Sequence, residues 1–222
     1  MNIFLIRHGR QNSTLCNVNV ELSKEGRRQA ELTGERIKDY AIEAVYSSDL
    51  IRAVETADII NQYVGAPRFI DPRYQELNFG ELTGLSNEVL KERFKDFLDY
   101  RSTMQEDVAY PGGECGREAF DRAYQALLDI TKQDYENVAI VTHGGVIRAL
   151  TAGLMGGNFN KCLVVGRQIE NCSISELLYD RDMNTFHIER LNDYAHIEKY
   201  DELRRKHFST GFFTVKNEQD NN

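Results

Sequence analysis

Two histidines in this chain each follow a short apolar segment and precede glycine. His8 comes after residues 2–6, and His143 comes after residues 138–141 and before Gly144. Because ligands of open α/β sheets lie beyond the carboxyl ends of the strands, we expect both imidazoles at one edge of a sheet. Glycine lets backbone N–H groups approach an anion closely. This arrangement indicates a site for an anionic group.

Two arginines are expected at the same edge. Arg7 directly precedes His8, and Arg52 falls in the first turn of a predicted helix whose expected N-cap is Asp49. A guanidinium binds phosphate oxygens in pairs, and phosphoryl transfer depends mainly on positioning and charge stabilisation. The set therefore indicates phosphoryl transfer, in which one neutral histidine attacks phosphorus and the other, kept cationic by the phosphate, shares the charge.

Such a reaction also needs a proton donor, because an alkoxide is a poor leaving group. Glu76 lies in a predicted loop that ends at Gly80, and it is the best placed carboxyl group by sequence. The same group would later act as the base that activates water. The adjacent arginines would repel a metal cation, so we predict no zinc site at His8, His143 and Glu76.

The elements that must position these residues alternate between apolar runs and segments with helical spacing. This pattern is typical of an α/β domain with a largely parallel sheet. We predict strands at residues 2–6, 44–46, 68–70 and 138–141, a hairpin from 173–179 and 185–191, and helices at 23–39, 49–65, 86–101, 117–132 and 146–154.

Composition limits the function classes. The chain has 222 residues and a formal charge of −8, which opposes binding to nucleic acid or to an anionic membrane. The first residues show no leader-like pattern, and no segment approaches the roughly 18 apolar residues of a membrane helix. We therefore expect a cytoplasmic protein. Its four cysteines lack CxxC spacing and are predicted to be reduced thiols.

Five motifs occur in an order that resembles the histidine phosphatase superfamily, which includes the cofactor-dependent phosphoglycerate mutases and their phosphatase relatives. They are Leu5-Ile6-Arg7-His8-Gly9, Ser47-Ser48-Asp49-Leu50-Ile51-Arg52, Glu76 with Gly80 and Gly84, Pro111-Gly112-Gly113-Glu114, and Thr142-His143-Gly144-Gly145.

This resemblance implies a three-layer α/β/α sandwich with a mostly parallel central sheet. It implies that His8 is the phosphorylated nucleophile, that Arg7, Arg52 and His143 complete the phosphate pocket with Gly144, and that Glu76 is the acid and base. The scheme requires no cofactor and no metal. We expect one domain over residues 1–213, with a helical lid inserted at about 85–110 and a flexible tail at 214–222.

The chain departs from the family pattern in the loop after His8. Arg10 stands where an acidic residue is usual, and the segment from residue 8 to 22 is shorter than in the mutases. An asparagine that usually reaches the phosphate aligns by count with Thr14, and Asn12 or Asn17 could take its place. These three residues are the candidate loop contacts.

The segment 85–110 bears on the choice between a phosphatase and a mutase. A mutase must hold a second anionic group, yet the basic residues here are offset by acidic ones. We therefore predict a phosphatase acting on a small phosphorylated metabolite, in a homodimer by default. The alternatives are mutase-type phosphoryl transfer and a non-catalytic phosphate-binding protein.

Overall fold

The computed structural model describes residues 1–166 and 168–205, so the predicted tail at 214–222 lies outside the described residues. Its centre is a sheet with the strand order β3-β2-β4-β1-β5-β6. The first four strands in this order pair in parallel, whereas β5 runs antiparallel to both of its neighbours. The strands are β1 (Asn2–Arg7), β2 (Ala44–Ser47), β3 (Arg68–Ile70), β4 (Asn137–Thr142), β5 (Ile174–Asp180) and β6 (Thr185–Asp193).

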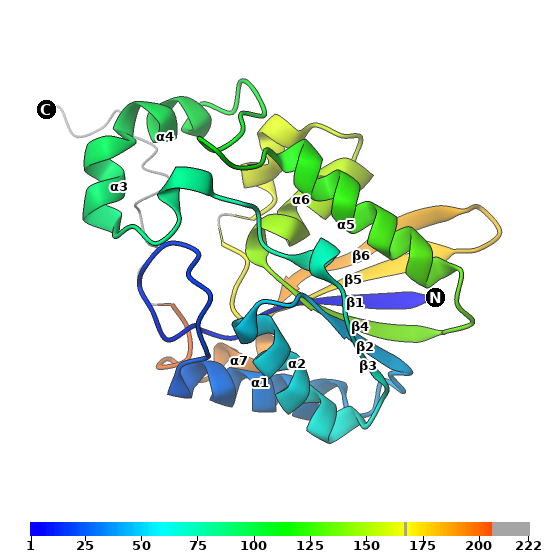
Figure 1. Ribbon diagram of the computed structural model, residues 1–222. Coiled ribbons are helices and arrows are strands. Elements are labelled where there is room, and N and C mark those ends of the chain that lie inside the picture. Colours follow the sequence, from blue (N-terminus) through cyan, green and yellow to red (C-terminus); the bar gives the residue numbers. More distant parts are fainter. Residues whose placement is uncertain (167, 206–222) are drawn as a thin grey trace, which may run out of the picture.

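Helices cover both faces of this sheet (Figure 1). On one face lie α1 (Lys24–Ile37), α2 (Ile51–Val64) and the short α7 (Ala195–Glu198), and on the other lie α5 (Gly116–Thr131) and α6 (Gly144–Leu154). The three-layer α/β/α sandwich predicted from the sequence is confirmed. The described residues also form the 3₁₀ helices η1 (Pro72–Tyr74), η2 (Gly80–Leu82) and η3 (Phe159–Val164).

The central strand β1 shows why both faces need helices. Ile3 and Leu5 pack into the core cluster that includes α5 and α6, whereas Phe4 and Ile6 pack into the cluster that includes α1 and α2. All four are buried. Because side chains alternate along a strand, a continuous apolar run buries both faces of the sheet, as is typical of parallel strands in α/β proteins.

Two helix predictions need correction. The helix predicted over 86–101 is in fact α3 (Asn87–Arg93) followed by α4 (Lys95–Ser102), and Phe94 forms the break between them. Phe94 packs against the same apolar cluster as Leu90 and Leu98, so the turn lets both short helices cover that cluster. Asp49 is not the cap of α2, because Leu50 occupies that position and the Asp49 carboxylate accepts hydrogen bonds from Gln75.

The sheet register brings the two histidine segments together. β1 and β4 are neighbours, and Arg7 is paired with Thr142 at their carboxyl ends. His8 and His143 therefore leave adjacent strands at the same level. In the part of the chain that the structure describes, no helix is long and apolar enough to cross a membrane.

Candidate active site

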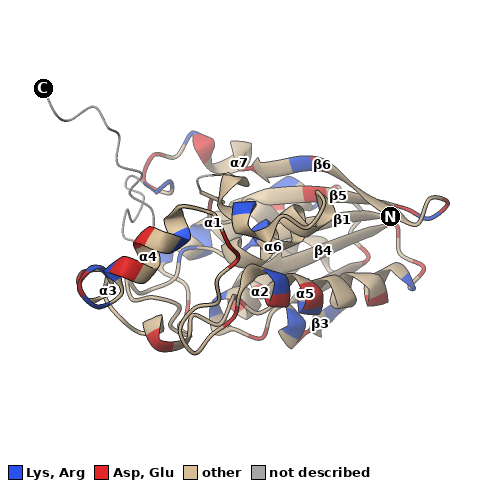
Figure 2. Ribbon diagram, turned by 90° about the horizontal axis from the view of Figure 1, so that it is seen from above, with Lys and Arg blue, Asp and Glu red and all other residues tan. Residues whose placement is uncertain are grey.

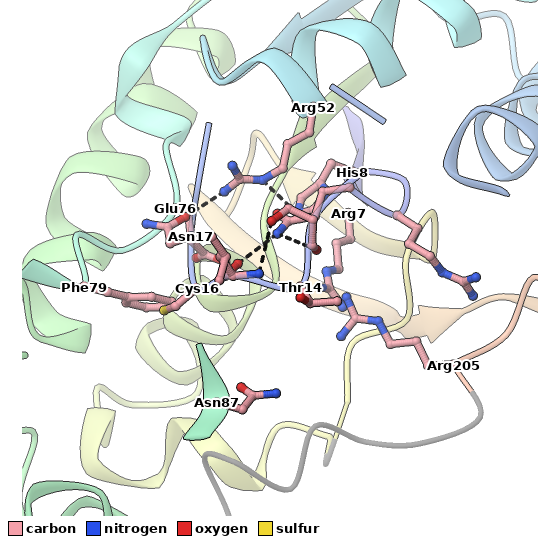
Figure 3. Close-up of a pocket in the computed structure, with 14 residues that line it drawn as sticks. Arg7, His8, Thr14, Cys16, Asn17, Arg52, Glu76, Phe79, Asn87 and Arg205 are labelled. Carbon is pink, nitrogen blue, oxygen red and sulfur yellow. Dashed lines mark hydrogen bonds between the residues drawn. The ribbon is translucent and has the colours of Figure 1, made fainter. Parts of the chain in front are cut away.

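A cavity of about 370 Å³ lies beyond the carboxyl end of β1 (Figure 3). Four of the five predicted catalytic residues line it: Arg7, His8, Arg52 and Glu76. They come from a strand end, a helix and a loop. The fold thus brings together side chains that are up to 69 positions apart in the chain, from Arg7 to Glu76.

The His8 imidazole is oriented by its two ring nitrogens. Nδ1 lies 2.6 Å from the carbonyl oxygen of Gly9, and since a carbonyl only accepts, Nδ1 carries the proton. Nε2 therefore carries the unprotonated lone pair, which accepts a long hydrogen bond of 3.3 Å from Nε of Arg52. Burial, and then the charge of Arg52, lower the pKa of His8 well below its ordinary value. The ring is thus neutral near pH 7, with Nε2 available as a nucleophile.

His143 packs against this nucleophile candidate. The two imidazole centroids are 5.0 Å apart, and Nε2 of His143 lies 2.9 Å from the hydroxyl of Ser48. His143 is fully buried, and its Nδ1 has no hydrogen-bond partner within residues 1–166 and 168–205. Burial lowers the pKa of His143, and the charges of Arg52 and Arg7 lower it further. A bound phosphate would raise the pKa of His143, because its negative charge favours the imidazolium.

Arg7 offers a hydrogen-bond donor that the described residues leave unpaired. One terminal nitrogen donates to the carbonyl of Ile169, whereas the buried Nε has no partner in the described part of the chain. A Cβ atom at Gly144 would lie 3.4 Å from this Nε, so the glycine backbone packs closely against the guanidinium. A buried unpaired N–H is costly, and an anionic oxygen would satisfy it.

Arg52 is held from its far end by the loop after β1. Its Nη1 donates to the carbonyl of Val18 at 2.9 Å, and its Nη2 donates to Oδ1 of Asn17 at 2.8 Å. Asn17 in turn donates to the carbonyl of Leu77, next to Glu76. Burial lowers the pKa of Arg52, although a guanidinium stays protonated in proteins. Asn17 therefore links the arginine to the loop that carries the acid.

The Glu76 carboxylate is fixed by two backbone N–H groups. Oε1 accepts from its neighbour Leu77 at 3.0 Å, and Oε2 accepts from Gly145 at 3.3 Å in the first turn of α6. The N-terminus of a helix favours a negative charge. A Cβ atom at position 145 would overlap Oε1 of Glu76. Gly145 is therefore the residue that allows the carboxylate to reach this position.

Only two of the three candidate loop contacts lie at the cavity. Thr14 and Asn17 line the cavity, but Asn12 does not. The exposed Asn12 side chain donates to Glu21 instead, although its neighbours Gln11 and Ser13 line the cavity. Thr14 and Asn17 therefore remain the candidate loop contacts that lie at the cavity.

Two further residues, one lining the cavity and one contacting the backbone of His8, escaped the sequence reasoning. Arg205 lines the cavity from the C-terminal side, and Asn171 donates a 2.8 Å hydrogen bond to the carbonyl of His8. Neither residue belongs to a recognisable motif. A signal did exist at Arg10, where the chain departs from the family pattern, but its partners lie more than 190 positions away. Among the described residues, no group of three or more His, Cys, Asp or Glu could hold a metal ion.

Comparisons with known proteins give independent information. The family model described as "Histidine phosphatase superfamily (branch 1)" matches residues 3–194. "Phosphoglycerate mutase-like protein 4" of Arabidopsis thaliana is 34% identical over 214 residues, covering 89% of this chain and 87% of that protein. "Uncharacterized phosphatase PhoE" of Bacillus subtilis is 32% identical over 163 residues, covering 70% and 78%. The structure of Bacillus stearothermophilus YhfR matches with a TM-score of 0.79 at 26% identity, covering 89% and 99%.

Proposed function

The chain belongs to the histidine phosphatase superfamily, and on this premise we propose that it hydrolyses small phosphate monoesters through a phosphohistidine on His8. The observation that carries the proposal is the unprotonated Nε2 of His8, held at a cavity that Arg7, Arg52 and Glu76 also line. A nucleophile, cationic groups and an acid lie together at one site, as phosphoryl transfer requires.

In the first step, Nε2 of His8 attacks phosphorus and the bond from phosphorus to the ester oxygen breaks. The ester oxygen takes the proton of the Glu76 carboxyl group and leaves as an alcohol. Arg7 and Arg52 bind the equatorial oxygens, with the unpaired Nε of Arg7 as one donor. The hydrogen bond from Nδ1 to Gly9 stabilises the ring as it becomes cationic on phosphorylation.

In the second step, the Glu76 carboxylate removes a proton from water, and the resulting hydroxide attacks phosphorus. The bond from phosphorus to Nε2 breaks, inorganic phosphate leaves, and His8 and protonated Glu76 return to their starting forms. The N–H groups of Leu77 and Gly145 hold the carboxylate in place for both proton transfers. The two steps balance without a metal or an organic cofactor.

Mutase-type transfer is the second candidate, favoured by the name of the Arabidopsis relative. Against it, the helices α3 and α4 in the predicted lid region carry charges of both signs (Figure 2). Glu88 and Asp96 occupy first turns, and Lys91, Arg93 and Arg101 occupy last turns. The helices α3 and α4 therefore lack the basic character expected of a lid that clamps a second phosphate.

The test is hydrolysis of p-nitrophenyl phosphate by the wild type and by His8→Ala. We expect the variant to lose activity about a thousandfold or more, because the covalent route is removed. His187→Ala is the matched control, since His187 lies on β6 and does not line the cavity. An alkaline quench of the wild type with labelled substrate should trap the phosphohistidine.

Three outcomes separate the candidates. An active His8→Ala variant contradicts the mechanism. A wild type that transfers phosphate only with a bisphosphate primer is a mutase. A wild type that binds inorganic phosphate but turns over neither substrate is a phosphate-binding protein. A small phosphorylated metabolite as substrate, a cytoplasmic location and a homodimer stay predictions.

A further inference from the structure

The cavity contains a guanidinium that the mechanism does not use. Arg205 lines it together with Arg7, Arg10 and Arg52. Figure 3 shows the Arg205 side chain reaching in from the C-terminal segment, with its guanidinium beside Thr14 and Arg7. An arginine beyond the two that hold the phosphate calls for an explanation, because like charges repel one another without an anion between them.

Arg205 is fixed relative to the nucleophile through one residue. Its Nε donates a 2.8 Å hydrogen bond to Oδ1 of Asn171, and Nδ2 of Asn171 donates a 2.8 Å hydrogen bond to the carbonyl of His8. The bond to Asn171 is made by Nε, and the two terminal nitrogens of Arg205 donate no hydrogen bond to any other residue within 1–166 and 168–205. These contacts thus orient the Arg205 guanidinium toward the cavity and leave its two terminal nitrogens to donate hydrogen bonds to a ligand.

Arg10 holds the segment that carries Arg205. Its Nη2 donates to the carbonyls of Leu203 and Arg204 at 2.7 and 3.1 Å, and Nη1 donates to the carbonyl of Glu202 at 3.4 Å. Gln29 adds a 2.7 Å hydrogen bond to Leu203, whose side chain is buried. This explains the departure from the family pattern at position 10, since an acidic residue there could not donate to three carbonyls.

The protein offsets the charge of Arg205 only in part: burial lowers the pKa of Arg205, and the negative charge of Glu170 acts against this by raising it. The nearby acid is Glu170, but its carboxylate already accepts hydrogen bonds from Gln168 and from the backbone of Asn171. No ion pair joins Glu170 to Arg205 in the described part of the chain. Burial lowers the pKa of Arg7, and the positive charge of Arg205 lowers it further, which shows that the two guanidinium groups repel each other.

We propose that Arg205 is a specificity-determining residue that binds a second anionic group of the substrate, a carboxylate or a second phosphate, beside the phosphate held by Arg7 and Arg52. This inference rests on the proposed function and deepens it. The preferred substrates are then phosphate monoesters whose alcohol part carries another negative charge.

The experiment uses a three-carbon substrate series: propyl phosphate, its counterpart with a terminal carboxylate, and its counterpart with a terminal second phosphate. In Arg205→Gln, kcat/KM should fall about tenfold for one or both of the substrates that carry a second anionic group, as expected for loss of a charge-assisted hydrogen bond. For propyl phosphate it should stay within about twofold. The substrate that responds identifies the second group.

Arg204→Gln is the matched control. Its side chain pairs with Asp201 and does not line the cavity, so all three substrates should keep their wild-type kcat/KM. Arg10→Gln should reproduce the selective loss, since it releases the segment that presents Arg205. An equal loss on all three substrates in Arg205→Gln would overturn the proposal, because Arg205 would then belong to the common phosphate pocket.

A binding measurement keeps this test separate from that of the hydrolytic function. Calorimetry compares propyl phosphonate with the analogue that bears a terminal carboxylate and the analogue that bears a second phosphonate. The wild type should bind at least one of the two longer anions about tenfold more tightly than propyl phosphonate, and Arg205→Gln should remove this preference. Equal affinities in the wild type overturn the proposal even if the protein is an active phosphatase. A preference in a protein without turnover supports the subsite and rejects hydrolysis.

Discussion

Nη2 of Arg52 donates a 2.8 Å hydrogen bond to Oδ1 of Asn17, so a loop residue fixes the orientation of a cavity arginine. Asn17 has a φ of 45°, which asparagine tolerates better than most residues. The same side chain donates to Leu77 beside Glu76. One asparagine thus couples the proposed phosphate clamp to the proposed acid.

Asn17→Gly should therefore weaken catalysis while preserving the loop backbone, since glycine accepts a positive φ. We expect kcat/KM for p-nitrophenyl phosphate to fall about tenfold, because Arg52 loses one positioning hydrogen bond. Asn12→Gly is the matched control from the same loop and should retain wild-type activity, because Asn12 is exposed and does not line the cavity. Equal losses in both variants would show that loop flexibility, and not the contact to Arg52, is responsible.

The protonation state of His8 gives a second prediction. Its pKa is lowered, so the neutral ring persists as the pH falls through 6.5, the ordinary value for histidine. In an NMR titration of the ring, His8 should remain neutral and protonated on Nδ1 at pH 6. In Arg52→Gln the pKa should rise, because a positive neighbour that disfavours the imidazolium is removed. A midpoint near 6.5 in the wild type would contradict the proposed electrostatics.

Gly145→Ala should lower kcat while leaving the free energy of unfolding almost unchanged. The new Cβ would overlap Oε1 of Glu76 and approach Leu77 Cδ1 to 2.8 Å, which displaces the carboxylate. We expect kcat to fall about tenfold to a hundredfold, since the proton transfers lose their geometry. The free energy of unfolding should change by no more than about 1 kcal/mol, because alanine is the better helix former. Wild-type kcat with an unchanged fold would argue against Glu76 as the acid.

Acid should destabilise the fold through His196. Its pKa is lowered from 6.5 to about 4, mainly by burial, although it has a hydrogen bond to the carbonyl of Cys172. A folded-state pKa below the unfolded one means that the stability is fully present above pH 6.5 and is lost as the pH falls toward 4. The full loss is at most about 3 kcal/mol, reduced by partial exposure of the ring.

Urea denaturation of the wild type and His196→Gln at a series of pH values tests this prediction. Glutamine keeps an N–H donor for Cys172 but does not titrate, so its free energy of unfolding should fall less between pH 6.5 and 4. If both proteins lose stability in parallel, the other buried histidines, His8 and His143, dominate the acid response.

The strand ends and the catalytic candidates were predictable because their signals are local. An apolar run followed by Arg7 and His8 specifies a buried strand that ends at a polar edge, and the same holds for β4 and His143. The order of motifs then indicated the family, which the family model confirms. The break at Phe94 was not predictable, because helical spacing continues through it and only packing on the core reveals the turn.

The sequence by itself thus determined the layered fold and the residue types at the cavity, since periodicity and motif order depend on neighbours in the chain. The tertiary structure alone decided which loop asparagine faces the cavity and that Arg205 joins the site. These features depend on contacts between segments far apart in sequence, such as Arg10 with Leu203 and Asn171 with His8. No local pattern encodes such contacts, because each is fixed only when the packed elements bring the two segments together.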